Sequence, residues 1–252
     1  MKKVIITIGL MVLLVGGQAE AVVNFNDGGY HVIDYIINDS VKVDYNTPGA
    51  GTQIDILSGG WLQYGLEAYG TSNVSINGGR VDSPFATWNN SRTVMYSGIV
   101  DRIAVNINSE LEIHGGEITG GIGISNNSSA IVTGGTIGEI GIGGLLTMSG
   151  GTILEGIGAS GNGLVTLIGT DFQVNGHNVS YGDQASTWAT PGIDPWGHPW
   201  LTGTVTGILE SSDVINNSFT FYQNGNITFI PEPATLFFFL AGSVIIRHKK
   251  RN

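Results

Sequence analysis

Two aspartates, Asp82 and Asp101, are the residues of this chain whose spacing best suits acid and base chemistry. They lie 19 positions apart, and each has an arginine nearby, Arg80 and Arg102. Hydrolysis of a glycoside needs two carboxylates about 5–10 Å apart across the substrate. A polysaccharide lyase would instead use clustered aspartates for calcium and an arginine or lysine as its base. The alternative interpretation is a solvated row of acids whose repulsion the arginines relieve.

A second cluster contains Glu112, His114 and Glu117. In a strand Glu112 and His114 share one face, so both could bind a metal ion, but Gly115-Gly116 separates Glu117 from them. Two aligned ligands are fewer than a metal site needs. A surface acid and histidine are therefore the alternative interpretation, and the sequence predicts no cofactor.

The segment from Trp188 to Trp200 holds three tryptophans together with Asp194 and His198. Exposed aromatic rings there could stack on sugars, as in a sugar-binding adhesin, with Trp196 as the residue to test. Alternatively the rings close one end of the fold, since each buries about 150–250 Å².

Composition excludes several function classes. The segment 22–231 carries four cations and 18 acids, a net charge of −14, which argues against nucleic acid as a partner. The chain has no cysteine and 40 glycines, so disulfides are excluded and helix is disfavoured. It has no Ser-His-Asp order, phosphate-binding loop or dinucleotide fingerprint.

A repeat of about 19 residues must position these candidates. Its clearest copies begin at Ser72, Ser109 and Ser128 and read Ser-x-Val-x-Ile-x-Gly-Gly-x-Ile with variations. The second glycine position recurs at 60, 79, 98, 116, 135, 151 and 170, which implies seven coils. Glycine pairs permit sharp corners because glycine reaches positive φ freely.

Aligned copies give two apolar columns and, between them, one mixed and mostly polar column that is expected to point outward. The column three residues before the second glycine contains Leu57, Ile76, Met95, Ile113, Val132, Met148 and Leu167. The column two residues after it contains Leu62, Val81, Val100, Ile118, Ile137, Ile153 and Phe172. A second apolar patch recurs as Ile103-Ala104-Val105, Ile122-Gly123-Ile124, Ile140-Gly141-Ile142 and Ile157-Gly158-Ala159. Each coil therefore has at least two short strands.

Such a pattern predicts an all-β fold, a single-stranded parallel β-helix whose coils bury their inward residues by stacking. A right-handed helix is favoured. A left-handed hexapeptide helix needs an aliphatic residue at every sixth position, which coils of 16 to 19 residues do not keep. A calcium-bound β-roll would need a Gly-Gly-x-Gly-x-Asp run, which is missing.

The flanks are expected to cap the solenoid of residues 51–172. Residues 22–50 read as N-terminal cap strands, and residues 173–230 as a loop followed by capping strands at 201–205, 219–222 and 227–230. Asn224-Gly225 is a hairpin-turn signal between the last two of these strands.

Both ends of the chain carry targeting sequences. Lys2-Lys3, an apolar stretch and Ala19-Glu20-Ala21 predict a signal peptide, residues 1–21, cut by signal peptidase after Ala21. At the other end, Pro231-Glu232-Pro233 precedes an apolar run at 236–246 and a basic tail containing Arg247, Lys249, Lys250 and Arg251. The apolar run is short of the ~20 residues of a stable membrane span, although a tail anchor remains an alternative.

Residues 231–252 closely resemble the PEP-CTERM sorting signal. The resemblance implies recognition by an exosortase-type membrane protease after the basic tail has stopped on the cytoplasmic side. The mature pattern also resembles exported bacterial β-helix proteins with the same tag. We therefore expect an envelope- or matrix-associated structural or adhesive protein, transiently anchored by residues 236–246. A polysaccharide lyase, a glycoside hydrolase and an adhesin for extracellular polysaccharide remain alternatives.

Overall fold

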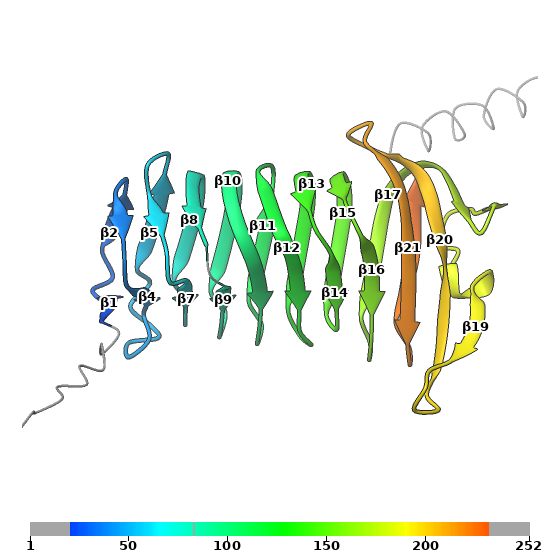
Figure 1. Ribbon diagram of the computed structural model, residues 1–252, viewed down its shortest axis with the longest axis horizontal. Helices are drawn as coiled ribbons and strands as arrows, with labels where there is room; N and C mark the ends of the chain where they lie inside the picture. The colour runs from blue at the N-terminus through cyan, green and yellow to red at the C-terminus, as the bar shows by residue number, and fades with distance from the viewer. Residues whose placement is uncertain (1–20, 83, 232–252) are drawn as a thin grey trace, which may run out of the picture.

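The chain folds into a β-solenoid of about eight turns with a spacing of about 19 residues (Figure 1). The computed structural model describes residues 21–82 and 84–231. Helix within these ranges is limited to one 3-10 turn, Ala185–Thr187, and none of their helices is long and apolar enough to cross a membrane. The predicted all-β class is confirmed.

Most turns contribute strands to three faces. Face 1 stacks β1 (Val22–Phe25), β4 (Ser40–Val43), β7 (Leu66–Ala68), β9 (Phe85–Thr87), the ends of β10 (Arg92–Val105) and β12 (Glu117–Ile124), β14 (Ile140–Ile142), β16 (Gly156–Ala159) and β21 (Val214–Tyr222). All of these neighbours are parallel and in register.

Face 2 stacks β2 (Tyr30–Ile33), β5 (Gln53–Leu57), β8 (Asn73–Val81), the start of β10, β11 (Glu110–Ile113), β13 (Ser129–Ile137), β15 (Leu145–Ile153), β17 (Leu164–Val174) and β22 (Asn226–Pro231). Face 3 is shorter. It stacks β3 (Ile36–Ile37), β6 (Trp61–Leu62), the end of β8, the middle of β10, the start of β12 and the ends of β13 and β15.

The residues of the two predicted apolar columns lie in the core, with one exception. Every residue of both columns is buried except Leu57, which is half-buried. Its place in the core is taken by Ile56, which pairs with Ile76. The register shifts directly after Ile56, so Leu57 lies opposite both Asn77 and Gly78. The irregular first copy of the repeat is therefore out of alignment by one residue.

Glycine pairs form the corner between faces 2 and 3, as predicted, and the two glycines have different functions. One of each pair has positive φ, for example Gly78 at 96° and Gly135 at 88°. The other lies where a Cβ would collide with the preceding turn. A Cβ on Gly79 would lie 2.3 Å from Ile56 Cγ2, and one on Gly134 would lie 2.5 Å from the carbonyl oxygen of His114.

The N-terminal flank belongs to the solenoid itself. Strands β2, β3 and β4 pair in parallel with β5, β6 and β7, so residues 22–43 begin the stack rather than cover it. This first turn accounts for the difference between the seven coils counted from glycine positions and the observed number of about eight.

The C-terminal flank is a cap. Strand β20 (Pro199–Leu209) runs antiparallel to both β17 and β21, and β18 (His177–Asn178) and β19 (Thr190–Ile193) pair antiparallel to β17 and β20. The predicted Asn224-Gly225 hairpin is wrong. Strand β21 stacks on β16 and β22 stacks on β17, both in parallel, so this turn joins two faces of the solenoid. The described core lies entirely between Ile33 and Phe229.

Candidate functional site: an axial groove on face 1

Asp82 and Asp101 occupy matching positions on adjacent turns, as expected, since Val81 pairs with Val100. They line a small hollow of about 320 Å³ with Arg80 and Glu117. Both carboxylate oxygens of Asp82 are already hydrogen-bonded, one to Trp61 Nε1 at 2.6 Å and the other to Arg80 Nε.

The two aspartates differ in their surroundings. Asp101 is exposed and accepts a hydrogen bond from Thr119 at 3.4 Å, and Arg102 pairs with Glu139 at 3.5 Å. The two flanking arginines therefore do not form one symmetrical site. The geometry supports a structural function for Asp82, which holds Trp61 across a turn.

Glu112 and His114 lie together on face 2, but the glutamate is already paired. Arg92 Nη2 donates to Glu112 at 2.6 Å, while His114 Nε2 lies 3.5 Å away and its ring stacks on Tyr96. The hydrogen bond from Arg92 lowers the pKa of Glu112. Glu117 starts the next strand, and across residues 21–82 and 84–231 no three His, Asp or Glu side chains are grouped to bind a metal ion.

The three tryptophans of the predicted aromatic segment have different environments. Trp188 packs against the core, and Trp200 stacks on Tyr222 with ring centroids 6.2 Å apart. Trp196 is 81% exposed, in the turn between β19 and β20. Asp194 closes this turn by accepting hydrogen bonds from the backbone N–H groups of Trp196 and His198 and from the His198 ring. Two of the three rings therefore stabilise the cap.

The targeting residues lie mostly outside the described residues. Ala19, Glu232, Pro233, the apolar run 236–246 and the basic residues Arg247, Lys249, Lys250 and Arg251 all fall there. Ala21 is exposed immediately before β1, and Pro231 is the last residue of β22, opposite Gly169. The predicted sorting motif thus begins at the last residue of the last strand of the solenoid.

Hollows larger than the one beside Asp82 lie over the outward side of face 1. Two hollows of about 380 and 700 Å³ share Gly123, Gly141 and Gly158 as a common floor. These residues are in register with Ala104 on one side and Thr220 on the other. We call this surface the glycine groove. With ~4.8 Å between neighbouring strands, it runs along the solenoid axis for roughly 20 Å.

The floor glycines, unlike the corner glycines, are not required by the fold. None has positive φ, and a Cβ would meet nothing within 4 Å at Gly123, only a carbonyl oxygen at 3.9 Å at Gly141 and one at 3.7 Å at Gly158. Glycine in a strand interior costs about 0.5–1 kcal/mol relative to alanine. Such glycines often mark a surface that a ligand or another backbone approaches closely.

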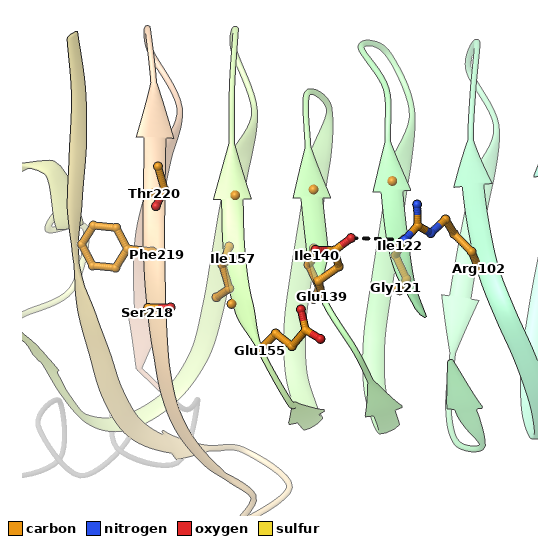
Figure 2. Close-up of a pocket in the computed structure, with 14 residues that line it drawn as sticks. Arg102, Gly121, Ile122, Glu139, Ile140, Glu155, Ile157, Ser218, Phe219 and Thr220 are labelled. Atoms are coloured by element: carbon orange, nitrogen blue, oxygen red, sulfur yellow. Dashed lines mark hydrogen bonds and ion pairs between the residues drawn. The ribbon is translucent and has the colours of Figure 1, made fainter. Parts of the chain in front are cut away.

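Side chains of different chemistry line the two rims. One rim, shown in Figure 2, carries Arg102, Glu139 and Glu155, with Arg102 and Glu139 joined by an ion pair. The other rim carries the neutral residues Asn106, Ser125, Asn126, Ser160 and Tyr222. Tyr222 is 37% exposed and is backed by the Trp200 ring. The groove thus offers hydrogen-bond donors, acceptors and one aromatic surface around a bare floor.

Sequence reasoning recognised these strands but missed the groove. The signal was present in the middle residue of each three-residue apolar patch, which is Ala104, Gly123, Gly141 or Gly158. Because strand residues alternate between faces, that residue points outward, and four successive small residues predict a bare channel.

Compared with protein-family models, curated proteins and solved structures, the chain matches none of them. We therefore infer its function from its own residues and their geometry.

Proposed function

We propose that this chain is an exported, non-enzymatic β-solenoid that binds an extended, neutral polysaccharide along the glycine groove. Its sequence signals favour cleavage by signal peptidase after Ala21 and sorting at Pro231-Glu232-Pro233 by an exosortase-type protease. The product is retained in the cell envelope or the extracellular polymer matrix. The groove is the observation that carries the binding function.

The shape and chemistry of the groove favour a linear, hydroxyl-rich ligand. A floor without side chains lets a flat chain lie close to the backbone of several turns in succession. The neutral rim of Asn106, Asn126 and Ser160 can both donate and accept hydrogen bonds, as sugar hydroxyls require. A net charge of −14 on residues 22–231 disfavours an anionic polymer.

Binding is tested with purified residues 22–231, which contain the entire described core. Affinity electrophoresis and calorimetry against neutral and acidic polysaccharides should show retardation by neutral polymers. Gly141→Tyr places a ring on the floor and should abolish binding. Thr147→Tyr is the matched control, because Thr147 lies on face 2, is half-buried and points away from the groove. Equal binding by both variants would show that the polysaccharide does not bind in the glycine groove.

Export and sorting need a separate experiment in the producing cell. Fractionation should find the mature protein at the cell surface or in the matrix, and replacement of Pro231-Glu232-Pro233 by alanines should leave a membrane-associated precursor. An uncleaved wild-type precursor in the cytoplasm would contradict the localisation.

A carbohydrate-active enzyme is the second candidate, because Glu139 and Glu155 line the same hollow as Arg102 (Figure 2). Two carboxylates beside a sugar-binding channel are the minimum for glycoside hydrolysis. We expect no release of reducing ends or unsaturated uronides, with or without calcium. If release occurs, Glu139→Gln with Glu155→Gln tests this pair, and Asp82→Ala with Asp101→Ala tests the other.

A further inference from the structure

The first turn of the solenoid has an open edge on all three faces. In the part of the chain that the structure describes, β1 pairs only with β4, β2 only with β5 and β3 only with β6. Gln53 N–H donates to the Gly29 carbonyl at 2.9 Å, so the ladder to β5 uses the backbone groups of alternate residues, Gly29, His31 and Ile33. The backbone groups of Tyr30 and Val32 point away from the solenoid.

This edge lacks most of the features that protect free strands from association. Lysine, proline and bulges are the usual ones. The three strands read Val-Val-Asn-Phe, Tyr-His-Val-Ile and Ile-Ile, without lysine or proline, and their pairing shows no register shift. Asn24 is polar and points outward, and the inward-pointing His31 is paired with Asp27 at 2.8 Å.

Large apolar side chains surround the same edge. Tyr30, Tyr35 and Ile36 are each more than half exposed, and Val22 and Val32 are about 40% exposed. Inside the turn, Phe25 packs on His31 with ring centroids 4.7 Å apart, which fills the end of the core. The end is therefore a filled platform with an apolar rim and unpaired backbone groups.

The opposite end of the solenoid is closed. Strand β20 covers β17 and β21 by antiparallel pairing, and β22 is met by the segment around Gln184, where Gly182 N–H donates to the Phe229 carbonyl at 3.0 Å. A first turn therefore cannot continue the stack of another copy at that copy's C-terminal end.

We propose that the first turn is a self-association surface, on which two copies of the mature chain join end to end. A single peptide strand could pair with only one face, whereas another first turn presents strands on three faces at the same spacing. Because the C-terminal end is closed, only like ends meet. The contact is then isologous, about a twofold axis perpendicular to the solenoid, and its strands run antiparallel. This inference is independent of polysaccharide binding.

Association is tested with residues 22–231 carrying an affinity tag at the C-terminal side, so that the end under test stays free. Sedimentation and light scattering over a wide concentration range should show a dimer. Small-angle scattering should show nearly twice the maximum dimension of one solenoid. Higher salt should strengthen the dimer, because the first turn carries Asp27 and Asp34 without lysine or arginine, and salt screens the repulsion between two such ends.

Val32→Pro is the decisive variant, because it removes an N–H that points to the open edge and leaves the ladder to β5 intact. It should weaken dimerisation at least about tenfold while circular dichroism and thermal unfolding match those of Val32→Thr, the control that keeps the N–H. A monomeric wild type, a compact side-by-side dimer, or a Val32→Pro protein that is folded and still dimeric would each overturn the proposal. If Val32→Pro does not fold, Ile36→Lys on β3 serves as the edge-blocking variant.

Discussion

The carboxylate of Asp213 accepts a hydrogen bond from the backbone N–H of Gly151 at 2.7 Å, although 62 residues separate them. Gly151 is a corner glycine with φ of 90°, and Asp213 lies in the turn between β20 and β21. Ser211 donates to the same carboxylate at 2.7 Å. This contact fixes the C-terminal cap on a corner of the solenoid.

Replacement of Asp213 should loosen the cap. Asp213→Asn removes a charge-assisted acceptor, and we expect a loss of about 1–2 kcal/mol in the free energy of unfolding. Urea unfolding followed by circular dichroism measures it. Asp101→Asn removes the same charge where the single hydrogen bond is 3.4 Å long, and should change stability by less than about 0.5 kcal/mol. Equal effects of the two variants would exclude a specific contribution from Asp213.

Stability should fall in acid, partly through the same carboxylate. The hydrogen bonds from Gly151 and Ser211 lower the pKa of Asp213 in the folded state. A group with a lowered folded pKa contributes stability that is complete above its unfolded pKa of about 3.9 and is lost as pH falls through the folded pKa. Urea midpoints should therefore be flat near neutral pH and decline below about pH 5. Asp213→Asn should decline less steeply, and an unchanged slope would contradict this assignment.

Filling the glycine groove should raise stability while it removes binding. Gly141→Thr and Gly158→Thr each replace a strand glycine at a position with room for a Cβ, so each should stabilise by up to about 1 kcal/mol. Gly79→Ala is the opposite case, because its Cβ would collide with Ile56 at 2.3 Å, and it should destabilise. Thermal unfolding separates these outcomes. Destabilisation by Gly141→Thr would show that the fold itself requires the bare floor.

Two of the exposed aromatic residues, Tyr222 and Trp196, should differ in function. Tyr222 lines the groove, whereas Trp196 lies in the turn between β19 and β20. Tyr222→Ala should weaken polysaccharide binding several-fold, and Trp196→Ala should leave both binding and stability unchanged. Affinity electrophoresis of the two variants checks this. Loss of binding in Trp196→Ala alone would instead support an adhesin that uses the cap.

The repeat was predictable because it follows from period-two alternation and glycine corners, which are local properties of the chain. The register at Ile56 and Leu57 could not be predicted, because the one-residue shift depends on how the irregular first copy of the repeat pairs with Asn77 and Gly78. The Asn224-Gly225 turn was misread as a hairpin for a related reason. Turn residues specify a reversal of direction, but the competing partners β16 and β17 come from turns more than 50 residues away in the sequence.

The candidate site was harder to predict than the fold. Sequence reasoning selected charged and aromatic residues as candidates, among them Asp82, Asp101 and Trp196. In the structure, Asp82 accepts hydrogen bonds from Trp61 and Arg80. The floor of the groove consists mainly of glycines, which have no side chain. The groove can therefore be recognised only when the middle residues of four strands are placed in register.

The in-register stacking of Ile118 on Ile137 means that the chain returns to an equivalent position after one repeat. Excision or duplication of that repeat would bring equivalent positions of the repeat into contact, such as Val100 and Ile137, and change only the number of turns. The length of polymer that the groove can span therefore depends on the number of turns. A gene that gains or loses copies of the repeat can change the length of the groove by one turn at a time, while the residue types that line it stay the same.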